Sequence, residues 1–355
     1  MHSFLGQYFM SHPPNGLNEQ VTEATVAPTD RDIRVSQLFV YPVKSCRGIS
    51  VQTALITKYG FRHDRYWVVT DENYRFLSQK DEGRLVLIQP TLHEDPPSLS
   101  SSNPEGGPVK PYLALNVVDG SQPEIRVPLY PDSTELQALK PCKVTVFLDQ
   151  ASGYDLGDEV AAWFSRFLGR SVRLVRRAEF EVRRIHTNVP SDELLEVPAQ
   201  TAFANDAPFL LASEASMQDV NDHLDEKIDI RHFRPNIMVD GCSAFEEEAW
   251  KRIHLQRLIT TAEGVTATPA LVVDLLVTSR CTRCPLTNTN PDTGVPSPNH
   301  QPLKTIVNYR RVDPGAKFRG CFGMNCVPVR LGQMISVGDW VVVKETGKHF
   351  RISEF

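Results

Sequence analysis

Residues 277–294 have the sequence VTSRCTRCPLTNTNPDTG, in which Cys281 and Cys284 lie three positions apart among arginines and threonines. The apolar run at residues 271–277 leads directly into this stretch and has the composition of a buried strand. The polar residues that follow the cysteines predict a loop. We therefore expect both thiols at the end of a strand, where a loop can present side chains and backbone N–H groups to a ligand.

The rest of the chain favours a mainly β protein with a few helices, which is an α+β fold. Apolar and β-branched runs predict strands at residues 33–40, 66–70, 74–77, 112–118, 236–239 and 334–343. We expect residues 66–70 and 74–77 to pair in a short hairpin, and residues 334–343 to form a final hairpin. Apolar residues spaced by three and four predict a helix at residues 160–168 that ends at Gly169. A second helix is expected to begin after Ser213, a suitable N-cap.

The composition is that of a soluble globular protein of about two domains: the chain has 355 residues, of which 41% are hydrophobic and 23% charged. We expect two packed β-barrel-like domains, at residues 34–180 and 181–347, after a disordered tail at residues 1–33. The net charge of −5 gives no indication of nucleic-acid binding, and no apolar run is long enough to span a bilayer. Seven thinly spread cysteines and the lack of a signal or transit peptide favour reduced thiols and a cytoplasmic location.

The residues alone leave several interpretations of the cysteine pair open. Together with Cys321 and Cys326 the pair could bind zinc, although the 36 residues between the two pairs exceed common zinc-ribbon spacing. A thioredoxin-type redox pair would require Cys281 to open a helix, and a loop is expected there. In a third interpretation one cysteine is a ligand, favoured as a thiolate by the flanking arginines, and the other is a bystander. Two unreactive thiols are the plain alternative.

Other cations also stand where strands are expected to begin or end. Lys44 and Ser45 follow the first strand, and Arg65 and Arg234 each precede a strand. If these residues converge with Arg283, they can bind an anion with several oxygens, such as a phosphate, through charge-assisted hydrogen bonds. The helix after Ser213 could add its N-terminus to the same pocket. The residues alone therefore indicate a site with a thiolate and a phosphate-bearing ligand, and they do not indicate a more specific function.

Seven segments occur in the order YPVKSCRGI, GFRHDRYWVV, RLVLI, FLLASEAS, FRPNIMVDG, SRCTRCPLTNTNPDTG and FGMNC. In this combination the chain resembles the MOSC family, whose members carry a molybdenum cofactor sulfurase C-terminal domain preceded by an N-terminal β-barrel domain. It is most similar to the subgroup that contains the mitochondrial amidoxime-reducing component and its bacterial relatives. The resemblance covers residues 34–343, nearly the whole of the expected ordered chain.

The resemblance implies a molybdopterin site. The family's metal-binding cysteine stands seven residues before the proline of an Asn/Asp-Pro-x-Thr-Gly turn, and here Pro291 stands seven residues after Cys284. Cys284 is thus the implied molybdenum ligand and catalytic residue, and Cys281 the bystander; thiolate is a soft donor that suits such a metal. The other implied cofactor-binding positions are Lys44, Ser45, Arg65, Asp206, Ala207, Arg234, Thr282, Arg283 and Asn325. At residues 206 and 207 the family member compared has Thr-Ser, so a hydroxyl contact is in question and an acid stands near the expected phosphate.

The resemblance also implies an activity, the reduction of N-hydroxylated compounds such as amidoximes and hydroxylamines. Electrons would come from separate partners, cytochrome b5 and NADH-cytochrome b5 reductase, because no iron–sulfur domain follows the MOSC domain in this chain. A mitochondrial association is the alternative to a cytoplasmic location. The rival functions are a molybdopterin storage or transfer protein, a persulfide sulfur carrier, and a zinc-stabilised binding module. MOSC domains also occur in cofactor sulfurases, which suggests a link to pyridoxal phosphate, although no aminotransferase-like domain is evident here.

Overall fold

The computed structural model describes residues 32–94, 110–147, 149–179, 183–259 and 268–352. The predicted tail therefore lies almost entirely outside the described residues. The described chain is mainly β with short helices, so the predicted α+β class is confirmed. The domain boundaries at residues 34–180 and 181–347 stay predictions.

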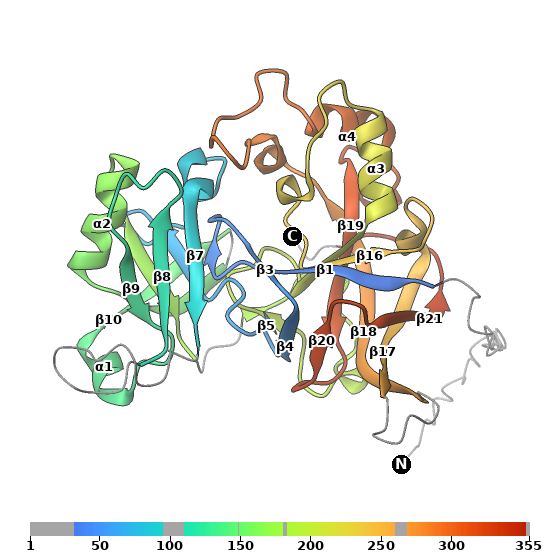
Figure 1. Ribbon diagram of the computed structural model, residues 1–355, viewed down its shortest axis with the longest axis horizontal. Helices are drawn as coiled ribbons and strands as arrows, with labels where there is room; N and C mark the ends of the chain where they lie inside the picture. Colours follow the sequence, from blue (N-terminus) through green and yellow to red (C-terminus); the bar gives the residue numbers. More distant parts are fainter. Residues whose placement is uncertain (1–31, 95–109, 148, 180–182, 260–267, 353–355) are drawn as a thin grey trace, which may run out of the picture.

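The C-terminal half is built around a closed barrel (Figure 1). Its strands follow the spatial order β16, β15, β19, β18, β17, β21 and β1, and a further pairing of β1 with β16 closes the ring. The strands are β1 (Arg34–Val40), β15 (Phe209–Ser213), β16 (Ile237–Asp240), β17 (Trp250–Ile259), β18 (Thr268–Thr282), β19 (Cys321–Pro328) and β21 (Trp340–Thr346). Closure leaves no free edge in the ring, and β3 (Ile49–Val51) extends the sheet beyond β1. The apolar interior includes Leu38, Phe209, Ile253 and Leu275.

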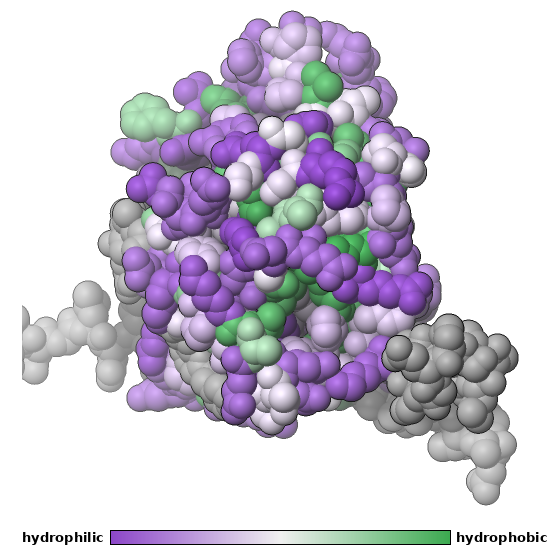
Figure 2. Space-filling view, turned by 90° about the vertical axis from the view of Figure 1, so that its left-hand side faces the viewer, coloured by the Kyte–Doolittle hydropathy of each residue, from purple (hydrophilic) through white to green (hydrophobic). Residues whose placement is uncertain are grey.

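The N-terminal half consists of two further sheets, on the left in Figure 1. One contains β10 (Lys140–Val146), β11 (Asp149–Asp155), β12 (Arg173–Arg177), β6 (Trp67–Thr70) and β2 (Val43–Lys44), and the other β7 (Ile88–His93), β8 (Tyr112–Val117) and β9 (Ile125–Pro128). The predicted helix is α2 (Asp158–Leu168), which ends at Gly169 in a left-handed conformation as expected. Its apolar face packs into the core of this half, where Phe164 is fully buried. Figure 2 shows that hydrophilic side chains cover most of this face of the molecule, with interrupted hydrophobic patches near its middle.

Short elements connect the sheets. The strands are β4 (Thr53–Thr57), β5 (Gly60–Phe61), β13 (Arg183–Arg184), β14 (Gln200–Thr201) and β20 (Met334–Ser336). The helices are α1 (Ser133–Ala138), α3 (Glu214–Asp222) and α4 (Leu303–Tyr309), with 3-10 turns at Gly83–Leu87, Asp192–Leu194, Ile230–His232, Glu246–Ala249, Pro285–Asn288 and Pro314–Ala316. The predicted cap of α3 is confirmed, because Ser213 Oγ accepts a hydrogen bond from the Ser216 N–H at 3.1 Å.

Two hairpin predictions need correction. The final hairpin is wrong: β20 pairs with β4, whereas β21 pairs with β17 and β1 and completes the barrel. The turn between them crosses from one sheet to the other, and Gly338 allows it by adopting a φ of 90°. The hairpin after β6 is less regular than predicted, because residues 74–77 form isolated bridges, from Phe76 to Thr70 and from Arg75 to Thr145, in place of a strand. A positive φ of 58° at Tyr74 interrupts the extended backbone there.

The loop of the quoted stretch is pressed against the N-terminal half. Asn290 Oδ1 accepts hydrogen bonds from the N–H groups of Asp292 and Thr293 at 2.8 and 3.1 Å, which gives the Asn-Pro-Asp-Thr-Gly turn its shape. A Cβ atom added at Gly83 would lie 2.0 Å from the carbonyl oxygen of Gly294. Glycine at position 83 is therefore what allows the two backbones to approach so closely.

We predict that Gly83→Ala destabilises the protein by ~1–3 kcal/mol, because the methyl group forces the two backbones apart. Thermal or denaturant unfolding measures this loss. Gly347→Ala is the matched control, since its added Cβ would meet only the flexible side chain of Lys251, at 3.3 Å. Equal stability losses in the two variants would show that the Gly83–Gly294 contact does not constrain the fold.

Candidate functional site

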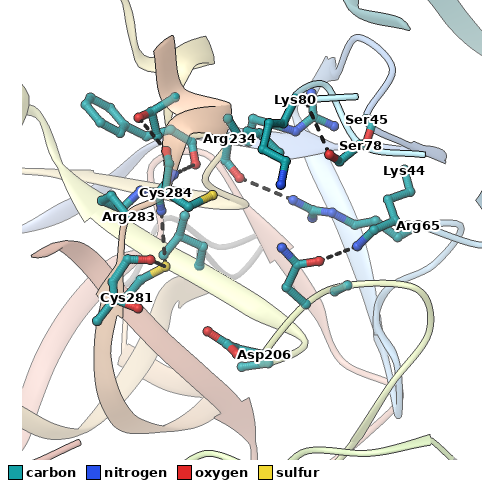
Figure 3. A pocket seen from close by; sticks show the side chains of 18 of the residues that line it. Lys44, Ser45, Arg65, Ser78, Lys80, Asp206, Arg234, Cys281, Arg283 and Cys284 are labelled. Atoms are coloured by element: carbon teal, nitrogen blue, oxygen red, sulfur yellow. Dashed lines mark hydrogen bonds between the residues drawn. The ribbon is translucent and has the colours of Figure 1, made fainter. Parts of the chain in front are cut away.

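A cavity of about 480 Å³ lies where the two halves meet, and Figure 3 shows it from close by. The structure brings all ten predicted site residues to its wall: Lys44, Ser45, Arg65, Asp206, Ala207, Arg234, Thr282, Arg283, Cys284 and Asn325. Figure 3 shows Cys284 and Arg283 on one side of the cavity and Lys44 and Arg65 on the other. Residues separated by more than two hundred positions in the chain thus share one wall, which strand ends and loops supply.

Sequence reasoning missed other polar residues of the wall, notably Ser78, Lys80, Asn205, Asn236 and Arg319. Asn236 could have been found, because it follows Arg234 by two positions in the same FRPNI segment. Lys80 and Arg319 lie in polar loops that carry no distinguishing pattern. The expectation for the helix after Ser213 is wrong: Ser213 does not line the cavity, and its hydroxyl bonds to Ser216 and to the buried carboxylate of Glu247.

The two cysteines of the quoted stretch have different environments. Cys284 is exposed and stands just before the 3-10 turn Pro285–Asn288, where the Thr287 N–H and hydroxyl both donate to its carbonyl oxygen. Cys281 lies within β18, and its sulfur accepts a hydrogen bond from Arg283 Nη1 at 3.1 Å. Burial raises the pKa of the Cys281 thiol above its ordinary value, and the nearby Arg283 charge only partly opposes this. Both thiols line the cavity, and Cys284 is the more exposed of the two.

A four-thiolate zinc site is not formed. Cys321 and Cys326 are buried in β19, and burial raises the pKa of Cys321 to about 12. Within the described ranges there is no group of three or more His, Cys, Asp or Glu side chains that could hold a metal ion. The cysteine spacing that suggested zinc therefore does not correspond to a metal-binding cluster among these residues.

Two arginines of the wall lie over the same aromatic ring. The guanidinium carbons of Arg65 and Arg234 lie 4.4 and 4.3 Å from the ring centroid of Tyr41. Arg65 also pairs with Asp64 and donates to Asn236 Oδ1 at 3.0 Å. Arg234 donates from Nη1 to the Cys46 carbonyl at 2.7 Å, but its buried Nη2 has no partner in the described ranges. Burial lowers the pKa of Arg234 to about 10, because a desolvated guanidinium is costly to keep charged.

Lys44 adds a third cation to this group. Its ammonium donates to the Phe203 carbonyl at 2.6 Å and to the side chain of Asn205. Burial lowers the pKa of Lys44 well below its ordinary value, and the neighbouring arginines lower it further. An anion in the cavity would favour the charged form of Lys44 and offset the mutual repulsion of the three cations.

The backbone at this site is held in an uncommon conformation. Ser45, Arg65 and Arg234 have φ angles of 72°, 51° and 58°, in the left-handed region that residues other than glycine seldom occupy. Such conformations cost roughly 1–3 kcal/mol each and concentrate at functional sites. The fold therefore accepts strain at three positions that aim polar side chains at one cavity.

The opposite side of the cavity is anchored by β18 and β19. Arg283 donates from Nη2 to the Phe233 carbonyl at 2.7 Å, and its Nε is buried without a partner. Asn325 is held by a hydrogen bond from its Nδ2 to Ser279 Oγ at 3.0 Å. Thr282 ends β18 opposite Cys321. Within the described part of the chain, Arg283 Nε is thus a buried donor without an acceptor, one residue before the exposed Cys284.

Asp206 is the residue at which the chain departs from the family pattern. Its carboxylate accepts a hydrogen bond from Arg351 Nη2 at 3.1 Å, so it is paired with a cation from the C-terminal segment. Ala207, next to it, has no polar side-chain atom to offer. The hydroxyl contacts that Thr-Ser would supply are thus replaced by a charged pair at the cavity wall.

These observations define a class of protein: a mainly β chain with a cationic cavity that suits a phosphate-bearing ligand beside an accessible thiol. Comparison with known families agrees with this description. Residues 32–171 match the MOSC N-terminal beta barrel domain, and residues 198–342 match the MOSC domain. The chain belongs to the MOSC-domain family.

Relatives of this chain are amidoxime-reducing components. It is 32% identical over 286 residues to mitochondrial amidoxime-reducing component 1 of Mus musculus, which covers 79% of this chain and 72% of that protein. It is 32% identical to mitochondrial amidoxime reducing component 2 of Rattus norvegicus and 31% identical to component 1 of Homo sapiens, over 86% and 80% of this chain and 81% and 74% of those proteins.

Three further findings bear on the predictions. A solution structure from Bordetella bronchiseptica overlaps 35% of this chain and 85% of its own at 18% identity and a TM-score of 0.24, which is too slight to carry an argument. None of these matches supports the suggested link to pyridoxal phosphate. Among the helices of the described residues, none has the length and apolar character needed to cross a membrane.

We predict that iodoacetamide alkylates one thiol of the folded, ligand-free protein quickly near neutral pH, and that this thiol is Cys284. The other six cysteines are buried or half-buried, and a raised pKa keeps Cys281 protonated at neutral pH. Mass spectrometry of the modified peptides measures the rates. In Cys284→Ala the fast phase should vanish, while in Cys281→Ala it should remain; a fast phase that survives Cys284→Ala would contradict the assigned exposure.

Anion binding in the cavity should weaken as pH rises. Lys44 and Arg234 both lose their protons at lower pH than usual because burial lowers their pKa values, that of Arg234 to about 10, so the affinity for sulfate, which does not titrate in this range, should fall about tenfold as the pH rises to about 10. Lys44→Arg should flatten this profile, because a guanidinium has a higher intrinsic pKa than an ammonium. Isothermal titration calorimetry gives the affinities, with exposed Lys304→Arg as the control. An affinity independent of pH in the unmodified protein would contradict the electrostatic account.

Proposed function

We propose that this chain is a molybdenum-cofactor oxidoreductase that reduces N-hydroxylated compounds, such as amidoximes and hydroxylamines, by removing the oxygen of the N–O bond. The observation that carries the proposal is the position of the exposed Cys284 thiol on the wall that also holds Lys44, Arg65 and Arg234. The family and the names of the relatives support it, since those proteins are amidoxime-reducing components.

The residues of the cavity fit molybdopterin. Molybdopterin carries a phosphate, and the buried Nη2 of Arg234 and Nε of Arg283 have no acceptor among the described residues. A buried donor without a partner costs roughly 1–3 kcal/mol, which an oxygen of a bound ligand would recover. The soft thiolate of Cys284 is a suitable donor to a metal that already has sulfur ligands. The unpaired donors, the positive charge and the exposed thiol of the cavity thus all fit molybdopterin as the ligand.

We assign the cofactor contacts to individual residues of the cavity. Lys44, Arg65 and Arg234 bind its phosphate, and Cys284 binds the metal. The other contacts come from Ser45, Ala207, Thr282, Arg283 and Asn325, and the remaining predicted position, Asp206, lines the same cavity. When bound, the cofactor supplies the two-electron redox chemistry that the reduction requires, while the protein binds and orients it.

The reaction itself sets what else the protein must provide. Reduction of an N-hydroxylated compound consumes two electrons and two protons, breaks the N–O bond and releases water together with the reduced nitrogen compound. The cavity wall also contains Phe76 and Phe147, whose ring centroids lie 5.0 Å apart, so apolar surface is available beside the cations for an organic substrate. We infer that small N-hydroxylated molecules enter from this side.

The electron donors remain part of the proposal. We propose cytochrome b5 and NADH-cytochrome b5 reductase as the separate electron-transfer partners, by analogy with the family. A cytoplasmic location, with mitochondrial association as the alternative, also stays a prediction. A molybdopterin carrier or a persulfide carrier would use the same exposed thiol, so the decisive experiment has to separate binding from turnover.

The two cysteines provide that experiment. Cys284→Ala should lose molybdenum from the purified protein and abolish reduction of benzamidoxime by a chemical reductant, because the metal loses its protein ligand. Cys281→Ala should keep most of both, since its sulfur accepts a hydrogen bond from Arg283 and donates one to the Thr282 carbonyl, and we assign it no bond to the metal. Elemental analysis and the turnover assay measure the two effects.

Other outcomes of these measurements would contradict a specific part of the proposal. Unmodified protein that contains molybdenum and molybdopterin but reduces no N-hydroxylated compound would support a carrier and contradict the enzyme. Equal losses in the two variants would contradict the distinct roles of the cysteines. One zinc per chain without molybdenum would contradict the cofactor assignment.

A further inference from the structure

The wall of the cavity includes two carboxylates among its cations, Asp81 and Asp206. Asp81 is occupied within its own turn, where Oδ2 accepts hydrogen bonds from the N–H and the hydroxyl of Ser78 at 3.0 and 2.7 Å. Asp206 is different, because its one side-chain bond is to a residue far away in the chain, Arg351. The negative charge of Asp206 acts to raise the pKa of both Lys44 and Arg183, because it favours their charged forms.

The C-terminal strap, residues 347–352, is firmly attached where it supplies Arg351. The Arg351 N–H donates to the buried Asp313 carboxylate at 2.9 Å. Asn188 bonds to the strap twice through its side chain, donating to the Phe350 carbonyl at 2.7 Å and accepting from the Ile352 N–H at 2.9 Å. A Cβ added at Gly315 would lie 1.9 Å from the Arg351 carbonyl oxygen, so the strap is packed on this turn without free space.

The guanidinium of Arg351 is oriented as well as attached. Its Nη1 donates to the Arg280 carbonyl at 3.2 Å, and its Nη2 donates to Thr187 Oγ1 at 3.4 Å and to Asp206 Oδ2 at 3.1 Å. The side chain of Arg351 is 13% exposed and that of Asp206 is 31% exposed. The Arg351 position is thus fixed by the backbone of β18 and by the strap, and Asp206 is the more exposed partner of the pair.

Without Arg351, the carboxylate of Asp206 would have a second set of partners. Lys44 and the arginines of the wall would attract it across the cavity, where it would occupy the positions that a ligand anion needs. An internal carboxylate is tethered to the site, so it competes with a free anion at a high effective concentration. A second partner for Asp206 outside the cavity removes this competition.

We propose that Arg351 is a positioning residue, which holds the Asp206 carboxylate on the side of the C-terminal strap and so keeps the cationic wall available to the anionic part of the ligand. This inference rests on the proposed function only for the identity of that ligand. It assigns a role at the cofactor site to a residue outside both matched domain segments. It also explains how the chain accommodates an acid where the family member compared has threonine.

A double-mutant cycle on the full-length, cofactor-free protein tests this inference, with sulfate as the probe and calorimetry near neutral pH as the measurement. Arg351→Ala should weaken sulfate binding about fivefold, the size of effect expected of a partly exposed charge pair. Asp206→Ala should bind sulfate at least as tightly as the unmodified protein. In the Asp206→Ala background, Arg351→Ala should then have no further effect, because no carboxylate remains to be positioned.

The alternatives give different patterns. If Arg351 contributed only a positive charge, or only stability, its removal would weaken sulfate binding equally in both backgrounds, and the inference would be wrong. Unchanged binding in Arg351→Ala, or no sulfate binding by the unmodified protein, would also overturn it. Arg330→Ala, which removes an exposed arginine away from the cavity, controls for net charge, and thermal unfolding verifies that each variant is folded.

The cycle is independent of catalysis. Protein that shows the expected pattern with sulfate but reduces no N-hydroxylated compound would keep the positioning role and contradict only the proposed function. Protein that reduces such compounds while Arg351→Ala binds sulfate normally would keep the function and contradict only the positioning role.

Discussion

The central constraint on this protein is the gathering of positive charge in a cavity that is partly withdrawn from water. Lys44 and Arg234 both have lowered pKa values because burial penalises their charged forms, and Arg65 lies over the same Tyr41 ring as Arg234. A fold does not assemble like charges in this way without compensation. Carbonyl groups, Asp64 and Asn236 supply part of it. The buried donors that remain unpaired are the part that a ligand can supply.

The architecture follows from this constraint at several points. The barrel delivers the ends of β15, β18 and β19 to one side of the cavity, and the N-terminal half delivers β2 to the other. The contact between Gly83 and Gly294 fixes the loop after Cys284 against the N-terminal half. Neither half therefore contains the whole site, and the site exists only while the two are packed together.

Sequence reasoning succeeded where the signal is local. The periodicity of α2, the cap of α3 and the apolar run of β1 are each written within one short segment, and the structure has them. The final hairpin failed because strand pairing is decided by partners far apart in the chain: β21 is needed between β17 and β1. The ten predicted site residues came from motifs carried by a family resemblance, and they share one cavity. Arg351 could not be found in that way, because its only signal is a spatial contact with Asp206.

The two cysteines of the C-x2-C pair have different environments although only two residues separate them. Cys281 lies within β18, half-buried at the cavity wall, and its sulfur accepts a hydrogen bond from Arg283. The pairing of β18 with β19 shifts register between Arg280 and Thr282, and the strand ends at Thr282. Two residues later, Cys284 has extended backbone and stands at the start of a 3-10 turn, with its thiol exposed to the cavity. A C-x2-C pair is therefore divided by the end of one strand into a structural thiol and an accessible one. Spacing alone cannot reveal this, because the irregular register is set by the partner strand β19.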